Sequence, residues 1–248
     1  MFPIRDMEQA SMAIGEERES HAEDQSPRGG LAAGLPLRTK GQDSRANRDQ
    51  ENAEDLALFR EFLAGMGSAL PEGRRQAREA YTKIYLRYRD RVYAYSLRML
   101  SSQEEAQDLY QEVFLRVLTR AQTFEEEKSL GGWIFTIAHN LCLNKLRDRK
   151  PHDTIDDMRP GLGASPHDPL VVRPPEDLGE SWRDRIEWAM AQLPAEQREA
   201  LVLREYEGLS HQEITEVLHA SIPAIKSRIY RAKESLRVLL GPYYNETI

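Results

Sequence analysis

The sequence predicts an all-α fold: two small helical domains joined by a Pro/Asp-rich linker, the second a helix-turn-helix, with a largely disordered N-terminal extension. Three observations lead to this prediction. Apolar residues recur at the spacing of an amphipathic helix through most of 74–149 and again through 182–240. Six prolines, which block helical hydrogen bonding, lie within 150–180. No segment shows the sustained alternation of a half-buried strand.

The first segment, 1–74, is expected to be a mostly disordered extension. Residues 1–52 are rich in Glu, Arg, Gly, Ser and Gln and have no hydrophobic periodicity. A short amphipathic helix is nevertheless predicted near 53–66, where apolar residues follow at helical spacing: Leu56, Phe59, Phe62, Leu63 and Met66. The sequence does not indicate what this helix packs against.

The first domain, 75–150, is predicted to contain three helices. One apolar stripe runs from Tyr81 to Met99, and a second helix begins at Ser102 or Gln103. Gly131-Gly132 is expected to break the chain, because glycine is a poor helix former. The third helix then runs from about Trp133 to Arg147.

A linker, 151–181, precedes the second domain, 182–240, and a tail follows at 241–248. Helices are expected over 182–193 and from Pro194 through Tyr206, the second ended by Gly208 in the left-handed conformation. The residues from Ser210 to Glu213 form a capping-box sequence that starts a short helix to about Leu218. Ser221 can cap the last helix, whose buried stripe is Ile225, Ile229, Ala232 and Leu236.

Composition limits the classes of function. Net charge is −7 over 248 residues, yet 74–150 carries an excess of five basic residues, which suits local contact with phosphates. Cys142 is the single cysteine, so a disulfide within the chain and a Cys-based zinc site are excluded. No signal peptide is evident, and no stretch approaches the ~20 apolar residues of a membrane span. We therefore expect a cytoplasmic protein.

The outer face of the last helix predicts DNA binding. A helix that enters the major groove needs small residues near its N-terminus and Arg or Lys for guanine edges and phosphates. That face presents Ala224, Lys226, Ser227, Arg228, Tyr230 and Arg231. A solvated basic helix in an ordinary helical hairpin is the alternative interpretation.

The polar face of the third helix suggests contact with unpaired bases. At 100° per residue, the apolar side chains gather on one side and polar ones on the other. The polar face and its flanks carry Trp133, Thr136, His139, Asn140, Asn144 and Arg147. An indole beside amide and guanidinium groups suits stacking on single-stranded DNA. The alternative, that Trp133 is a core lid and the amides are merely solvated, stays equally open.

The acidic face of the second helix has three interpretations. It carries Glu104, Glu105, Asp108 and Glu112. A carboxylate metal site is disfavoured because that helix has no histidine and no second acidic helix is evident, while a solvated face and a protein-docking surface both remain open. No phosphate-binding glycine loop and no nucleophile elbow is found. We therefore expect no catalytic site, no metal site and no cofactor.

Two segments resemble the sigma-70 family, in its extracytoplasmic-function group. Residues 108–115, DLYQEVFL, are similar to a signature of region two, and Trp133–Asn140, WIFTIAHN, to the strand-opening helix of that region. Residues 193–200, LPAEQREA, with 208–214 and 226–232, resemble region four. Thr215, where the family usually has Ala, and Gly131-Gly132 depart from the pattern, and the N-terminal leader lies outside it.

The resemblance implies a protein that binds core RNA polymerase and promoter DNA. Asp108, Gln111 and Glu112 would dock on the clamp coiled coil of the largest subunit, and the second domain would reach the flap region. The third helix would hold the minus-ten strand, with the loop 123–132 taking an extruded base. The last helix would bind the minus-thirty-five duplex, and an anti-sigma protein is expected as a further partner.

Two rival functions remain at this point. A conventional helix-turn-helix regulator of duplex DNA would explain 186–240 but not the polar face of the third helix. A sigma-like protein adaptor would bind protein partners and leave promoter DNA closed.

Overall fold

The structure, a computed structural model, describes residues 45–149 and 181–244. Every regular element in these ranges is a helix and none is a strand, which confirms the predicted all-α class. The chain divides into two compact units, Met1–Tyr93 with Gln107–Ala138, and Ala94–Ala106 with His139–Ile248. The ranges 1–44, 150–180 and 245–248 lie outside the described residues, and so do most of the expected disordered extension, the linker and the end of the tail. Within the described ranges, no helix has the length and apolar character needed to span a membrane.

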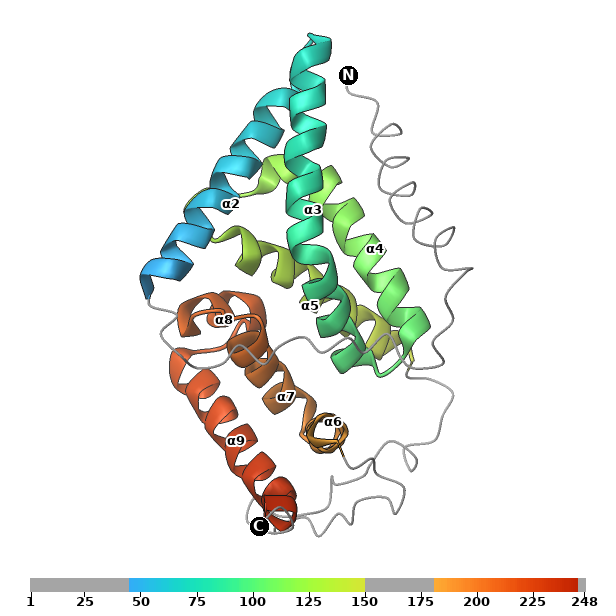
Figure 1. The fold of residues 1–248 in the computed structure, drawn as a ribbon, viewed down its shortest axis with the longest axis vertical. Helices are drawn as coiled ribbons and strands as arrows, with labels where there is room; N and C mark the ends of the chain where they lie inside the picture. The colour runs from blue at the N-terminus through green and yellow to red at the C-terminus, as the bar shows by residue number, and fades with distance from the viewer. Residues whose placement is uncertain (1–44, 150–180, 245–248) are drawn as a thin grey trace. The chain divides into compact units, whose positions relative to one another are not determined.

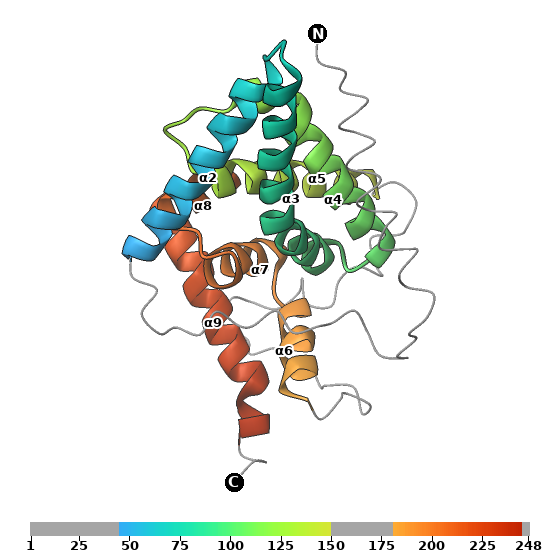
Figure 2. The same cartoon turned by 45° about the horizontal axis from the view of Figure 1, so that its top comes forward.

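Helix α2 (Arg45–Met66) begins earlier than the helix expected near 53–66. It runs alongside α3 (Pro71–Leu100), as Figures 1 and 2 both show. Phe59 and Phe62 are fully buried, so this helix is part of the first unit's core. Close approach of the two helices requires glycine, because a Cβ on Gly65 would meet the carbonyl oxygen of Gly73 and lie 2.7 Å from the Cβ of Ala77.

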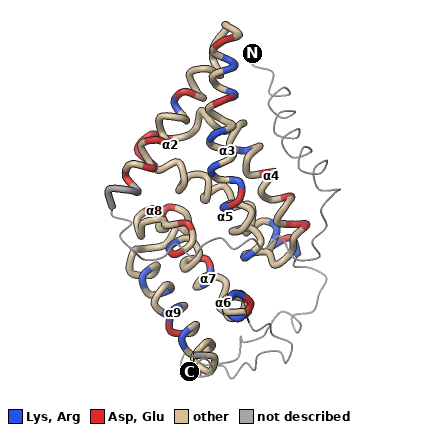
Figure 3. Tube along the Cα trace, viewed as in Figure 1, with Lys and Arg blue, Asp and Glu red and all other residues tan. Residues whose placement is uncertain are grey.

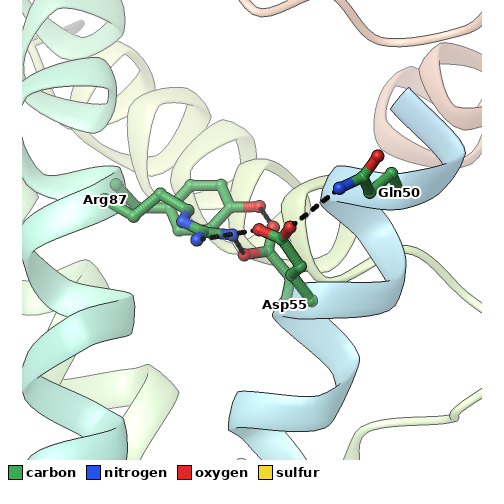
Figure 4. A network of polar contacts seen from close by, with 5 residues as sticks. Gln50, Asp55 and Arg87 are labelled. Atoms are coloured by element: carbon green, nitrogen blue, oxygen red, sulfur yellow. Dashed lines mark hydrogen bonds and ion pairs between the residues drawn. The ribbon is translucent and has the colours of Figure 1, made fainter. Parts of the chain in front are cut away.

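A buried carboxylate fixes α2 against α3. The Asp55 side chain accepts hydrogen bonds from the hydroxyl of Tyr88 and from the guanidinium of Arg87. Figure 4 shows Asp55 and Arg87 pointing toward each other, with Gln50 one turn away on α2. Burial, followed by the Asp55 charge, raises the pKa of Tyr88 far above its ordinary value, so its hydroxyl remains a donor.

Helix α4 (Gln103–Thr119) begins where predicted. Within the first unit, α3 contacts α4 through an aromatic pair, Tyr85 and Phe114, with ring centroids 4.8 Å apart. The Tyr81 hydroxyl donates to the carbonyl oxygen of Phe114 at 3.2 Å. A short 3-10 turn, η1 (Ala121–Thr123), follows α4.

Helix α5 (Leu130–Asp148) corrects the prediction that Gly131-Gly132 breaks the chain. Both glycines lie in its first turn, where the amide of Gly132 donates to the Ser129 hydroxyl oxygen at 3.1 Å. A Cβ on Gly131 would lie 3.1 Å from the hydroxyl oxygen of Tyr88. Glycine is therefore used here for close packing, and the hydroxyl of Ser129 compensates for its low helix propensity.

The C-terminal segment has five consecutive helical elements. They are α6 (Trp182–Ala191), α7 (Ala195–Leu201), its π-helical continuation η2 (Val202–Tyr206), α8 (His211–Leu218) and α9 (Ile222–Tyr244). Gly208 has φ 70°, and Ser210 and Glu213 form both hydrogen bonds of a capping box, so both predicted boundary signals are confirmed.

Helix α9 extends past the predicted boundary at 240. Its last turns pack on α6, where Leu240, Tyr243 and Ala189 form a buried cluster edged by Trp182 and Trp188. The residues 241–244 are therefore helical and in part buried, whereas a tail was expected. Apolar contact with α6 explains the extension, because a helix continues where it can bury an apolar face.

Candidate nucleic-acid interface

The first half of α9 separates buried from exposed side chains as the sequence predicts. Ile225, Ile229 and Ala232 are buried, and Leu236 is half-buried. The hydroxyl of Ser221 lies 3.4 Å from the amide nitrogen of Ala224 and can accept its hydrogen bond, which makes Ser221 a cap of the helix. Basic residues recur along the helix in Figure 3.

Four of the six candidate duplex-binding side chains are exposed, and two are half-buried. The exposed ones are Lys226, Ser227, Tyr230 and Arg231, and the half-buried ones are Ala224 and Arg228. Arg228 forms an ion pair with Glu196 of α7, with 2.6 Å between Nη2 and Oε2. Glu196 is largely exposed, so a phosphate or a guanine edge can compete for this guanidinium.

Three cations lie near the first residue of α8. The pKa of His211, the first residue of α8, is lowered by partial burial and by the nearby cations Arg204, Lys226 and Lys233. Those three cations come from η2 and α9, and Lys233 is paired with Glu205 of η2. Cations placed in this way can attract the phosphates of a duplex.

The candidate strand-binding residues all lie on α5 but differ in exposure. Asn140 and Arg147 are exposed, and Asn144 is half-buried. With Leu143 they line a shallow hollow of about 380 Å³, and the Asn144 side-chain oxygen accepts a hydrogen bond from Arg147. The Thr136 hydroxyl donates to the carbonyl oxygen of Gly132 at 2.8 Å.

Trp133 is half-buried in a cluster of three aromatic rings. Its ring centroid lies 5.6 Å from that of Phe59 on α2 and 5.3 Å from that of Phe124. Phe59 and Phe124 are themselves 4.9 Å apart in an edge-to-face arrangement. The structure thus combines both interpretations of Trp133, because the indole is supported by the core and still has an accessible part.

His139 is buried, although the sequence places it at the edge of the polar face. Its Nδ1 lies 2.6 Å from Oε1 of Glu199 on α7, and the hydroxyl of Tyr95 donates to the same carboxylate oxygen. Burial and the Glu199 charge raise the pKa of Tyr95. His139 can therefore reach DNA only after its pair with Glu199 separates.

The acidic face of α4 contains two glutamates in ion pairs beside two exposed polar side chains. Glu105 pairs with Arg149, whose guanidinium also donates to the carbonyl oxygen of Leu100 at 3.0 Å. Glu112 pairs with Arg116 at 2.7 Å. Asp108 and Gln111 are exposed beside it.

Sequence reasoning missed Phe59, Arg60 and Glu199. Phe59 was placed on an apolar stripe without a partner, and only the fold brings it to Trp133. Arg60 reaches Glu126 in the loop before α5, with 2.7 Å between Nη2 and Oε2. No sequence signal marks Glu199, because a glutamate on a short helix is ordinarily solvated.

The helix-turn-helix and the exposed basic face of α9 are typical of a DNA-binding protein. Residues 84–152 match the family model for Sigma-70 region 2, and residues 183–236 match that for Sigma-70, region 4. The chain belongs to the sigma-70 family, in the extracytoplasmic-function group of RNA polymerase sigma factors. Members of the family are transcription regulators rather than catalysts.

The matches to known relatives extend over nearly the whole length of those relatives. The ECF RNA polymerase sigma factor SigW of Bacillus subtilis is 31% identical over 164 residues, which cover 64% of this chain and 88% of the relative. The RNA polymerase sigma-H factor of Pseudomonas aeruginosa is 31% identical over 178 residues, 68% of this chain and 90% of the relative. The solved sigma factor RpoE, in complex with the anti-sigma factor NepR from Bartonella quintana, is 26% identical with a TM-score of 0.52 and covers 65% of this chain and 96% of that one. Membership of this family favours the function of a sigma factor over the two alternatives, a conventional helix-turn-helix regulator and a sigma-like protein adaptor.

Proposed function

We propose that this sigma factor divides promoter recognition between α9 and α5. The first half of α9 binds the minus-thirty-five element as duplex through Ala224, Lys226, Ser227, Arg228, Tyr230 and Arg231. The exposed basic side chains of α9 carry this part of the proposal, because phosphate contact requires accessible cations on one helix face.

The minus-ten strand is held on α5. Trp133, Thr136, Asn140, Asn144 and Arg147 meet the separated strand, and His139 joins them after it leaves Glu199. The part of Trp133 that stays accessible supports base stacking, and the hollow beside Asn140 offers amide and guanidinium donors. The segment 123–132, which contains the loop 124–129 and the first turn of α5, accepts an extruded base, and its contacts offset the stacking free energy lost on flipping.

Asp108, Gln111 and Glu112 dock on the clamp coiled coil of the largest polymerase subunit, and the C-terminal domain reaches the flap region. An anti-sigma protein is a further partner, by analogy with RpoE, which was solved with NepR. The protein works in the cytoplasm with polymerase.

Run-off transcription tests the proposal. Purified protein is added to core RNA polymerase that carries no other sigma factor, on promoters mapped by genome-wide transcript start sequencing after overexpression. Promoter-specific transcripts and permanganate-reactive thymines in the minus-ten region are expected. Core enzyme that binds the protein but starts at none of the mapped promoters would contradict the proposal.

A further inference from the structure

Helix α2 lies outside the residues 84–152 that match region 2, yet it contacts the loop 124–129 and the start of α5. Phe59 is fully buried and contacts the rings of both Phe124 and Trp133, which also contact each other. An edge-to-face arrangement of this kind fixes ring orientation as well as burying area. The orientation of Trp133 therefore depends on a side chain from α2.

The same helix holds the loop 124–129 by charge. This loop contains three consecutive glutamates, Glu125, Glu126 and Glu127, all of them exposed. Arg60 binds Glu126 through both Nε at 3.0 Å and Nη2 at 2.7 Å, and Lys128 pairs with Glu125 at 2.9 Å. Arg60 thus fixes the middle of the loop and reduces a negative charge that would repel a DNA strand.

Helix α2 is itself joined to α3 by hydrogen bonds to the buried carboxylate of Asp55, so it can serve as a support. The bonds from Tyr88 and Arg87 to Asp55 lie one turn before Phe59. A loop that is ordered before binding avoids losing conformational entropy at the moment of base capture.

We infer that α2 belongs to the strand-opening apparatus, with Phe59 positioning Trp133 and Arg60 positioning the loop that receives the extruded base. This inference rests on the proposed function of α5. It assigns a role in DNA melting to a helix that precedes the matched region. Phe59 and Arg60 act through other residues and do not need to touch DNA.

Charge exchange tests the role of Arg60. Holoenzyme is assembled with each variant, and permanganate reactivity of a mapped promoter measures the open fraction. Arg60→Glu is expected to lower the open fraction about two- to fivefold, as for loss of an exposed ion pair. Arg60→Glu combined with Glu126→Arg is expected to restore it. Core affinity and melting temperature should match wild type throughout, because both side chains are largely exposed.

Two matched variants separate the ion pair from net charge. Arg60→Glu with Glu127→Arg carries the same total charge as the restored variant but lacks the pair, and should remain impaired. Arg75→Glu breaks an equally short and exposed pair with Glu72 elsewhere in the same unit, and should open promoters normally. Equal rescue by both double variants, or equal loss in Arg75→Glu, would overturn the inference.

Phe59→Leu tests the role of the aromatic ring, because leucine keeps an apolar side chain at this position but removes the ring. Reduced opening is expected with core affinity unchanged, and Phe59→Tyr should retain more activity than Phe59→Leu because it keeps the ring. If the wild-type holoenzyme opens promoters and the Phe59 variants open them equally well, the inferred role of α2 is contradicted. The proposed function of α5 and α9 would then still stand. If wild type opens no promoter, the proposed function itself fails.

Discussion

At the residue scale, two glutamates on α7 have opposite environments. Glu196 is exposed and shares Arg228 with solvent, whereas Glu199 is buried between His139 and Tyr95. In the proposed interface the first would compete with DNA for a guanidinium, whereas the second satisfies two buried polar groups. Substitutions at the two positions should therefore differ in kind.

Arg228→Ala is predicted to weaken binding to the minus-thirty-five duplex by about 1–3 kcal/mol if the guanidinium reads a base. Glu196→Gln should instead tighten binding about two- to threefold, because it removes a competing carboxylate from an exposed pair. Fluorescence anisotropy with a labelled duplex measures both. Unchanged affinity in Arg228→Ala would remove this residue from the interface.

Glu199→Ala is predicted to lower the free energy of unfolding by about 1–3 kcal/mol, since it leaves the buried side chains of His139 and Tyr95 without their acceptor. Glu196→Ala, on the same helix, should change it by less than about 0.5 kcal/mol. Urea denaturation followed by circular dichroism gives both values. Equal stabilities would mean that Glu199 does not bear the buried contacts seen here.

At the element scale, the hairpin of α2 and α3 depends on small residues where the helices approach. Gly65→Ala is predicted to destabilise the protein by about 1–3 kcal/mol, because the obstacle to a new Cβ is the backbone of α3. Gly67→Ala has open space and an ordinary φ, and should be neutral or stabilising by up to about 1 kcal/mol. Thermal melts distinguish the two, and a harmless Gly65→Ala would refute the close approach.

The ends of helices were predictable from the sequence where neighbouring residues in the chain determine them. They were not predictable where contacts with distant residues determine them. The capping box at Ser210 and the left-handed Gly208 use only neighbouring backbone groups, so the sequence places both. Gly131 was misread as a break because its use depends on the hydroxyl of Tyr88, which is distant in sequence. The end of α9 was likewise set by contact with α6.

At the scale of the whole molecule, the proposed polymerase-docking residues on α4 lie on a different helix from the proposed DNA-binding residues of α5 and α9. Asp108→Arg with Glu112→Arg is predicted to abolish core polymerase binding, since two carboxylates at the proposed docking surface become cations. The fold should be intact, because Asp108 is exposed and the Glu112–Arg116 pair is half-exposed. Competition for core enzyme against a labelled wild-type sigma factor measures the loss.

Binding of this double variant to an isolated minus-thirty-five duplex provides the control, and it should equal wild type. Wild-type core affinity in the variant would overturn the docking assignment. Loss of both activities would indicate misfolding, which circular dichroism detects directly.

The sequence by itself determined the all-α class, the helix-turn-helix, the family and the basic outer face of α9, because periodicity, caps and motif spacing are local properties of the chain. Tertiary structure alone decided that Phe59 contacts Trp133, that Arg60 pairs with Glu126 in the loop before α5, and that His139 is buried against Glu199. These contacts join residues 60 or more positions apart. No pattern within one helix specifies its partner, because the same amphipathic stripe can pack against many surfaces.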